Sequence, residues 1–358
     1  MSSYRDDFKS LLENTYIPAW GNKEIMFQKM MYFLNSVAAY MPKRLYRYRK
    51  LDNEGHSIQS FENGTIALCK AKCFSDKYDS LVYVNVDQQV ALAEESTRKA
   101  LYGLIRDIKT KNPSLCADKV AKICLLLEQG MPDDKVVDKL IKEDYSIFLN
   151  ELRHDLRQRE SRFRESSQTA RIACFTESVQ SKFMWDTYAG GYQGFALEYN
   201  LKEYLTNCLN KGRAAYTFPV IYTGERPDLT VIEANDYVIT KAKEEGHIKN
   251  LDIIRPFLQL NLLSPYKPYL YKDKQEYGHE KEWRMLYFEE ENCEDYIEIP
   301  DDGCLKAIYY GMDIKPADQE KLHQIALKKG LKEYKVSIDE DSPKYSLKIN
   351  ALSEAEDK

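Results

Sequence analysis

The sequence predicts an α+β protein whose core is a mixed or antiparallel sheet, interrupted by a large helical insertion. Short segments of alternating residue character occur before residue 87 and again after residue 169. Between them, apolar residues recur at the spacing of an α-helix. Irregular lengths of helix separate the strands, which is typical of α+β folds rather than of a regular βαβ alternation. The predicted parts are N-terminal helices with the first strands (1–86), the helical insertion (87–169), the remainder of the sheet domain (170–349) and a flexible acidic tail (350–358).

Composition narrows the class of protein. The chain has 358 residues and a formal net charge of −5, so it has no overall attraction to nucleic acid or anionic lipid. A phosphate-bearing partner would have to bind a local group of Lys and Arg. No segment is long and apolar enough to cross a bilayer, and the first ten residues contain no apolar signal region. The 8 Cys include no C-x-x-C pair, which favours reduced thiols over a zinc site. These features predict a cytoplasmic protein without membrane association.

Helices and two short strands are predicted before the insertion. The first forty or so residues have apolar positions at helical spacing, and Pro42 ends that pattern. Leu45–Leu51 is a strand candidate with two different faces, because its basic and aromatic residues alternate. A turn at Glu62–Gly64 leads into a second strand at Thr65–Leu68. The apolar positions at helical spacing in this region are Phe27, Met30, Met31 and Leu34.

Residues 87–169 are predicted to be almost purely helical. Apolar residues recur at helical spacing from Val120 to Leu127 and again from Val137 to Leu152. The end of this span carries several Arg among acids. A solvated helix face with ion pairs is favoured there over a phosphate-binding stripe, because the acids interleave with the bases. These Arg are Arg153, Arg157, Arg159, Arg162 and Arg164.

Strands are predicted to return after the insertion. Two helical stretches lie between Leu229 and Leu263, and an irregular, Tyr-rich loop begins at Pro265. A well-marked helix starts at Pro316 and ends at Gly330, with acids near its start and lysines near its end, as the helix dipole favours. The predicted strands are Ile172–Phe175, Phe195–Tyr199, Val220–Tyr222, Trp283–Phe288, Tyr296–Ile299, Leu305–Tyr310 and Lys332–Ile338.

Five short polar and aromatic segments are unusual for a purely structural chain. They combine fixed charges with aromatic rings at strand ends or in loops, where sites usually form on a rigid scaffold. The segments are Tyr46–Arg49, Phe74–Ser80, Cys174–Glu177, Met184–Gly194 and Glu280–Arg284.

In this order the five segments resemble the bacterial family DUF2971, whose function is unknown, over roughly residues 45–311. The family pattern has an L-Y-[KR]-Y-R start, an F-N-D-P-x-D loop, a C-F-S-E strand end, an M-W-x-x-Y helix with a trailing glycine, and an E-x-E-W-R strand. This chain departs from the pattern at Ser75, Lys77, Thr176 and Thr187. Because Thr187 stands where a His is common, the chain lacks a His that could act as a base at that position.

The Glu280-x-Glu282 arrangement also resembles that of the ADP-ribosyltransferases, which implies an NAD-consuming site. In that chemistry Glu282 would stabilise a ribosyl cation, Arg47 would bind the dinucleotide phosphates, and Tyr188 would stack on nicotinamide. The implied fold has two facing sheets that form a cleft. The implied protein is an ADP-ribosyltransferase or NAD glycohydrolase with NAD as its substrate, such as a bacterial toxin or phage-defence effector. The candidate catalytic residues are Glu282, Glu280 and Tyr188; the candidate cofactor-binding residues are Arg47, Tyr48, Arg49, Trp185 and Arg284; further candidate site residues are Asp76, Asp79, Thr176 and Glu177.

Simpler structural roles compete at these positions. Arg284 lies two residues after Glu282 and would neutralise it on the same strand face. Trp185 fits a core position, and Asp76 and Asp79 are favoured as caps over ligands of a divalent ion. No His falls at a metal-ligand spacing, and no metal site is predicted. The sequence also lacks a phosphate-binding loop, a dinucleotide fingerprint and a nucleophile motif.

Three functions remain open from the sequence. The first is the NAD-consuming enzyme, and the second is a non-catalytic module that binds nucleotide or nucleic acid. The third is a metal-dependent nuclease built on the carboxylates. The expected partner is a nucleotide or small-molecule substrate, with a protein or nucleic acid target left open. The shared expectation is that Arg47, Asp76, Glu177, Tyr188 and Glu282 surround one concave pocket.

Overall fold

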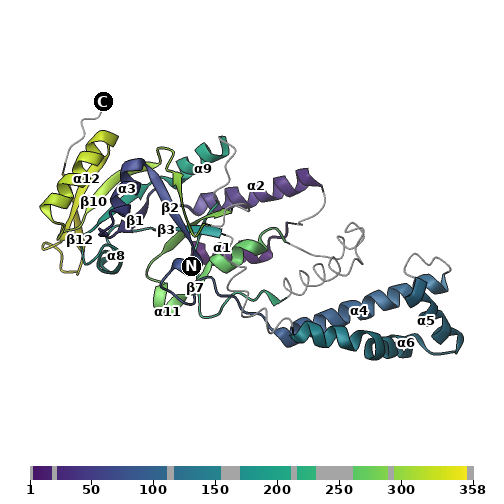
Figure 1. The fold of residues 1–358 in the computed structure, drawn as a ribbon. Helices are drawn as coiled ribbons and strands as arrows, with labels where there is room; N and C mark the ends of the chain where they lie inside the picture. Colours follow the sequence, from purple (N-terminus) through teal and green to yellow (C-terminus); the bar gives the residue numbers. More distant parts are fainter. Residues whose placement is uncertain are drawn as a thin grey trace.

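The structure is a computed structural model that describes residues 3–17, 22–110, 117–154, 170–210, 216–230, 261–288 and 294–352. Its strands form one open, mixed sheet and a separate two-stranded pair, with helices around them (Figure 1). The predicted combination of helices with a mixed sheet is therefore confirmed. None of the described helices is long and apolar enough to cross a membrane.

Ten of the described strands belong to the large sheet, in the order β12-β11-β10-β4-β1-β3-β2-β9 with β8 and β5 off this path. Neighbouring strands run antiparallel except for the parallel pair β10–β11. The strands are β1 (Leu45–Arg49), β2 (Thr65–Lys70), β3 (Ala170–Thr176), β4 (Phe195–Tyr199), β5 (Tyr216–Pro219), β8 (Glu282–Phe288), β9 (Tyr296–Pro300), β10 (Leu305–Tyr310), β11 (Lys332–Ile338) and β12 (Leu347–Ala351). The separate parallel pair consists of β6 (Ile221–Thr223) and β7 (Tyr271–Asp273).

Helices cover the sheet and form the insertion. Side-chain caps fit their starts: Ser3 and Asp6 form a capping box at α1, and Asn22 caps α2. The described helices include α1 (Tyr4–Asn14), α2 (Lys23–Tyr40), α3 (His56–Asn63), η1 (Ala71–Cys73), α4 (Val86–Lys109), α5 (Ala117–Glu128), α6 (Asp133–Leu140), the π-helical turn η2 (Ile141–Tyr145), α8 (Lys182–Tyr188), α9 (Leu201–Asn210), η5 (Ser264–Tyr269), α11 (Lys274–Tyr277) and α12 (Pro316–Lys329).

The buried residues of α2 are not the four apolar positions that the sequence shows at helical spacing. Phe33 and Val37 pack into the main core, whereas Phe27 is 66% exposed. Met30 and Leu34 are only partly buried against the same core. Apolar residues lie on several sides of α2, so the pattern alone does not choose the covered side. Contacts with the rest of the protein decide it.

Strand β3 is the point at which the sheet divides. One of its edges pairs with β8 from Ala170 to Thr176. On its other edge, β2 pairs at Arg171 and Ile172, whereas β1 pairs only at Thr176. The stretch of β3 between these contacts has no described strand beside it on that edge. We call this opening between β1 and β2 the fork.

Strand β1 contributes to two cores because its side chains alternate. Leu45 packs in the main core with residues of α1, α2 and α12. Tyr46 and Tyr48 face the opposite side of the sheet, where Tyr48 contacts Trp185 edge to face at a centroid distance of 5.0 Å. The alternation sends Arg47 to the same side as Leu45, at the fork.

The glycine that closes the fourth sequence segment is required by close packing. A Cβ atom at Gly194 would lie 2.1 Å from the carbonyl oxygen of Arg49 and 2.9 Å from that of Ala189. Only glycine lets the chain pass so close to the end of β1 before β4 begins. This approach connects α8, and therefore Tyr188, to the arginine-bearing strand.

The described part of the predicted insertion is helical. Helices α4, α5 and α6 project from the sheet as an extended arm (Figure 1). They share a hydrophobic core of their own, which includes Leu101, Ile123, Val137 and Leu152. No strand occurs in the described residues from 87 to 154. Residues 155–169, with most of the predicted Arg-rich stretch, lie outside the described residues.

Several elements near the C-terminus were not predicted. Strand β5 precedes the predicted strand at Val220, and β7 lies within the predicted Tyr-rich loop. Strand β12 pairs with β11 and contains Asn350 and Ala351, so the predicted start of the tail at residue 350 is too early. These strands are short or rich in polar residues, so their partners stabilise them more than their own pattern does. The two helical stretches predicted before Leu263 lie largely outside the described residues.

Candidate functional site

A pocket of about 400 Å³ opens at the fork. Residues from both sides of the divided sheet line it, together with the loop after η1, helix α8 and strand β7. The lining residues are Tyr46, Arg47, Tyr48, Arg49, Cys69, Cys73, Phe74, Ser75, Asp76, Asp79, Ile172, Cys174, Phe175, Thr176, Met184, Tyr188, Lys272, Tyr277, Glu280, Glu282 and Arg284. We call this cavity the fork pocket.

One wall of the fork pocket carries two arginines of β1. Nη2 of Arg47 donates a hydrogen bond of 2.6 Å to the carbonyl oxygen of Ala67 on β2, which links the two sides of the fork. The guanidinium lies over the ring of Phe175 at 5.8 Å, and its Nη1 is buried without a hydrogen-bond partner. Neither Arg47 nor Arg49 forms an ion pair with a carboxylate of the described residues.

Arg49 therefore has an unbalanced charge at the pocket wall. Burial and the nearby charge of Arg47 lower the pKa of the Arg49 guanidinium to about 9. Arginine keeps its proton in proteins, so the lowered pKa marks a cation in an unfavourable environment. An anion bound beside it would relieve this cost.

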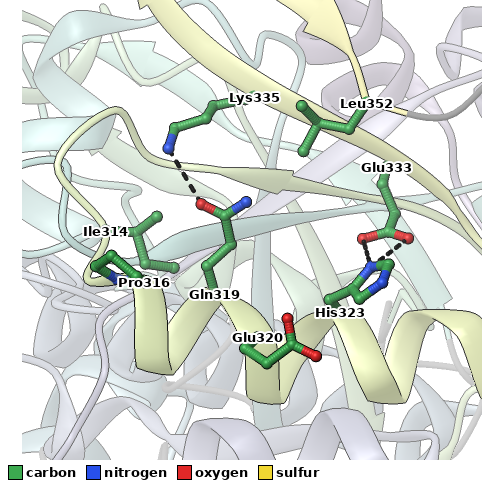
Figure 2. A pocket seen from close by; sticks show the side chains of 8 residues that line it. All are labelled: Ile314, Pro316, Gln319, Glu320, His323, Glu333, Lys335 and Leu352. Atoms are coloured by element: carbon green, nitrogen blue, oxygen red, sulfur yellow. Dashed lines mark hydrogen bonds and ion pairs between the residues drawn. The ribbon is translucent and has the colours of Figure 1, made fainter.

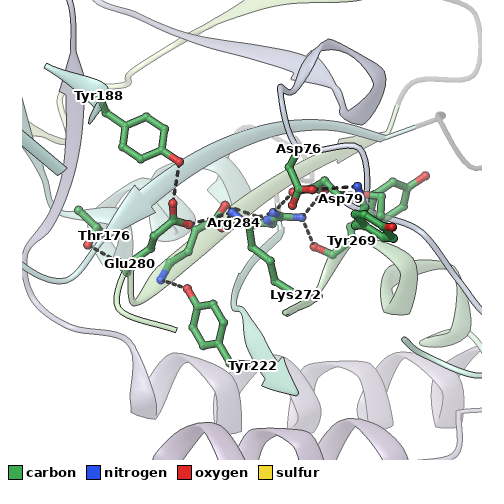
Figure 3. Close-up of polar contacts among 12 residues, drawn as sticks. Asp76, Asp79, Thr176, Tyr188, Tyr222, Tyr269, Lys272, Glu280 and Arg284 are labelled. Atoms are coloured by element: carbon green, nitrogen blue, oxygen red, sulfur yellow. Dashed lines mark hydrogen bonds and ion pairs between the residues drawn. The ribbon is translucent and has the colours of Figure 1, made fainter. Parts of the chain in front are cut away.

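On the other side of β3 from the arginines, the fork pocket contains a pair of buried carboxylates (Figure 3). The hydroxyl of Tyr188 donates to Oε1 of Glu280 at 2.6 Å, and Nζ of Lys272 donates to Oε2 of Glu280 at 2.8 Å. The same Nζ lies 3.3 Å from Oε2 of Glu282. Glu280 precedes β8, and Lys281 between the two acids has a left-handed φ of 49°. The local backbone, and not regular strand alternation, brings both carboxylates to Lys272.

Arg284 connects the carboxylate pair to the loop after η1. Its Nε donates to Oε1 of Glu282 at 2.8 Å, and its Nη1 donates to Oδ1 of Asp79 at 2.9 Å and to the carbonyl oxygen of Tyr269 at 2.8 Å. Burial acts to raise the pKa of Glu282, but the charges of Arg284 and Lys272 outweigh it and lower that pKa to about 2. Glu282 is therefore ionised throughout the physiological range.

The structure brings most of the candidate residues together and leaves two outside. Trp185 is fully buried, and its Nε1 donates to the carbonyl oxygen of Val179 at 2.7 Å, so it is a core residue and not a pocket wall. Glu177 accepts hydrogen bonds from Arg5, Tyr4 and Trp283, which anchors α1 to the sheet. The candidates that line the fork pocket are Arg47, Tyr48, Arg49, Asp76, Asp79, Thr176, Tyr188, Glu280, Glu282 and Arg284.

The two loop acids have different partners. Oδ1 of Asp76 accepts from the backbone N–H of Tyr78 at 2.8 Å, as expected of a turn cap. Asp79 instead pairs with Arg284, 205 positions away in the chain. Within the described residues no group of three or more His, Cys, Asp or Glu is placed to hold a metal ion. Asp79, Glu280 and Glu282 are instead paired with the cations Arg284 and Lys272.

Lys272 and Tyr277 line the pocket but were not among the candidate site residues of the sequence. Lys272 lies on β7, and its ammonium is 4.0 Å from the ring centroid of Tyr277 on α11. Both residues fall in the stretch predicted to be an irregular loop. The sequence around them contains many other charged and aromatic residues. No local pattern therefore identifies these two as site residues. Lys272 reaches the pocket because β7 pairs with β6, and Tyr277 follows on α11, which comes directly after β7.

A second cavity, of about 440 Å³, lies beside α12 (Figure 2). On its floor, buried Glu333 of β11 accepts hydrogen bonds from Tyr310 and lies 2.9 Å from Nδ1 of His323. The hydrogen bond to Glu333 raises the pKa of His323. The side chain of His323 is 38% exposed, so solvent screens this pair.

The His323–Glu333 pair predicts a small pH dependence of stability. Because the folded protein raises the pKa of His323, the pair stabilises the fold below about pH 6.5 and loses this effect as the pH rises through the raised pKa. We expect a loss of less than about 1 kcal/mol. An NMR titration of the imidazole should show the raised pKa, and Glu333→Gln should lower it. An unchanged titration in Glu333→Gln would contradict the assignment.

The comparisons with known proteins give one match. Residues 184–285 match the model of the family described as Protein of unknown function (DUF2971). This span contains the whole of the Met184–Gly194 and Glu280–Arg284 segments and confirms the resemblance seen in the sequence. No curated protein and no solved structure matched the chain.

Proposed function

We propose that this DUF2971-like chain is an NAD-consuming enzyme, either an ADP-ribosyltransferase or an NAD glycohydrolase, that acts at the fork pocket. The observation that carries the proposal is the separation of charge in the pocket. Arg47 and Arg49 on β1 have no carboxylate partner among the described residues, while Glu280 and Glu282 lie across β3, at the start of β8.

This separation matches the charges of the oxidised dinucleotide. NAD carries a diphosphate and, across one ribose, a cationic nicotinamide ring. Arginine donors bind diphosphate oxygens in a planar, bidentate manner. When the bond between ribose and nicotinamide breaks, positive charge develops on the ribose, and a fixed carboxylate lowers the barrier to that step. Glu282, which is ionised, would take this role, with Glu280 beside it.

Tyr188 supplies an aromatic surface next to the carboxylates. Its side chain is 39% exposed although its hydroxyl is bound to Glu280. The ring of Phe183 lies 6.3 Å from it, edge to face. A nicotinamide ring could stack on the exposed face of Tyr188 while the ribose lies against Glu280 and Glu282.

The divided sheet supports an ADP-ribosyltransferase-like cleft as part of the proposal. The set β12-β11-β10-β4-β1 and the set β9-β2-β3-β8-β5 meet at the single pairing of Tyr46 with Thr176. Arg47 comes from the first set and Glu282 from the second. The ligand would lie between the two sets, across the fork.

A second candidate is a non-catalytic nucleotide-binding module. It is favoured by the neutralisation of Glu282, whose two oxygens contact Arg284 and Lys272. In that case the arginine wall binds phosphate and the carboxylates have a structural role. The first proposal also includes a protein or nucleic acid target for the ADP-ribosyl group. It further includes a role as a bacterial toxin or phage-defence effector.

The proposed function is tested by incubating the purified protein with NAD and measuring released nicotinamide by chromatography. We expect release that a chelator does not affect. Arg49→Met should raise KM by about ten- to a hundred-fold with little change in kcat, because it removes charge-assisted hydrogen bonds of about 1.5–3 kcal/mol. Arg47→Ala should act in the same direction, but it also breaks the link to Ala67.

Arg44→Met is the matched control. Arg44 precedes β1, lies outside the fork pocket and pairs with Glu198. It should leave KM unchanged. NAD binding without nicotinamide release would favour the binding module, and the absence of both would reject NAD as the ligand.

A further inference from the structure

Lys272 contacts both glutamates of the fork pocket, Glu280 and Glu282 (Figure 3). Its side chain is only 8% exposed, and Nζ lies 2.8 Å from Oε2 of Glu280 and 3.3 Å from Oε2 of Glu282. The ring of Tyr277 covers another side of the ammonium at 4.0 Å. Lys272 reaches this position from β7, whose partner β6 also contributes Tyr222, the acceptor of the Glu282 backbone N–H at 2.7 Å.

The two glutamates depend on Lys272 to different degrees. Glu282 has a second cation, because Arg284 contacts both of its oxygens at 2.8 and 3.3 Å. Glu280 has no other cation in contact among the described residues. Its second oxygen accepts a hydrogen bond from Tyr188, which is a neutral donor. Without Lys272, two buried carboxylates would therefore share one site with Arg284 as their nearest counter-charge, and Arg284 also serves Asp79.

We infer that Lys272 is a positioning residue of this site, which holds Glu280 and Glu282 side by side as an ionised pair facing the ligand. The part that concerns catalysis rests on the proposed function. The electrostatic part concerns the folded protein alone. Two carboxylates in one buried site do not both ionise readily unless a cation lies between them, and Lys272 supplies that cation.

The other titratable groups around the pair come from several elements. They are Arg5 on α1, Arg284 on β8, Asp76 and Asp79 in the loop after η1, Cys174 on β3, Tyr188 on α8, Tyr222 on β6 and Tyr277 on α11. Burial acts to lower the pKa of Lys272, but the charge of Glu282 and the contacts to Glu280 outweigh burial. The net result is a pKa above the ordinary value of lysine, so the ammonium stays charged. Burial raises the pKa values of Cys174, Tyr188 and Tyr222. None of the three thus supplies a further charge near neutral pH.

The electrostatic part is tested by the free energy of unfolding of Lys272→Met between pH 5 and 8, without NAD. In this variant the pair takes up a proton at a higher pH than in the wild type. Since protonation relieves the repulsion, the destabilisation relative to the wild type should shrink as the pH falls. Lys272→Arg should restore the wild-type profile. If Lys272 contributed only packing, the destabilisation would be the same at every pH, which would overturn the inference.

Lys272→Gln provides a second variant if the Met variant does not fold. It keeps a polar side chain but lacks the charge, and its destabilisation should have the same pH dependence. Glu280→Gln combined with Lys272→Met should remove that dependence, because only one carboxylate of the pair is left to titrate. Retention of the dependence in this double variant would also overturn the inference.

The catalytic part is tested by the pH profile of nicotinamide release. In Lys272→Met the acid limb of the profile should move upward by about one to three pH units, because a cation in contact was removed. Lys272→Arg should leave the limb in place. A wild-type protein that releases no nicotinamide would reject the proposed function, while the stability measurements would still decide the role of Lys272. Release with an unshifted limb in Lys272→Met would overturn the role of Lys272 alone.

Discussion

Glu282→Gln is expected to lower the rate of nicotinamide release by roughly a hundred- to a thousand-fold, the loss typical of removing one preorganised charged group. The amide keeps the shape of the side chain but cannot stabilise a ribosyl cation. The effect should fall on kcat, since the interaction forms only as the glycosidic bond breaks. Steady-state kinetics with quantified nicotinamide would measure it.

Glu198→Gln is the matched control for this variant. Glu198 is also a buried glutamate of the same sheet, bound by Tyr309 and near Arg44, but it does not line the fork pocket. Both variants should lose some stability, and only Glu282→Gln should lose the reaction. Wild-type rates from a folded Glu282→Gln protein would remove Glu282 from the mechanism.

Arg284→Met is expected to destabilise the protein by about 3–5 kcal/mol, as the removal of one partner from a buried ion pair does. Arg284 is fully buried and binds Glu282, Asp79 and the carbonyl oxygen of Tyr269. Its loss leaves Asp79 and the carbonyl oxygen of Tyr269 without this donor in the interior, and Glu282 with Lys272 alone. Urea unfolding of the variant and the wild type at pH 7 would measure the difference.

Arg49→Met provides the contrast within the same pocket. Arg49 has no ion-pair partner among the described residues, so its replacement leaves no buried carboxylate unpaired. We expect its free energy of unfolding to stay within about 1 kcal/mol of the wild type. A similar loss in both variants would show that side-chain packing, and not ion pairing, is what Arg284 contributes.

Local patterns predicted the elements that carry the site. The alternation in Leu45–Arg49 predicted a strand with two faces, and the structure places Leu45 and Arg47 on one face and Tyr46 and Tyr48 on the other. The order of the five segments predicted the DUF2971 resemblance, which the match over residues 184–285 confirms. These features depend on neighbours in the chain, so one sequence is enough to show them.

Roles that depend on distant partners did not follow from the pattern. Trp185 fitted both a cofactor-binding position and a core position, and the fold, which buries it completely, decides for the core. Glu177 ends a strand beside Thr176, which lines the pocket, but Arg5 and Tyr4 of α1 bind it instead. In each case a helix or strand far away in the sequence decides which surface is covered, and a local motif contains no information about that partner.

By itself, the sequence determined the strands and helices whose side chains repeat with a clear period, and the residue types available to a site. Tertiary structure alone decided that β1 and β2 separate along β3, that Arg284 reaches Asp79 across 205 positions, and that Lys272 enters the pocket from β7. The physical reason is that buried charges are stable only when partners meet them in space. Strand pairing, and not the residues adjacent in the sequence, determines which charged side chain lies next to each buried charge.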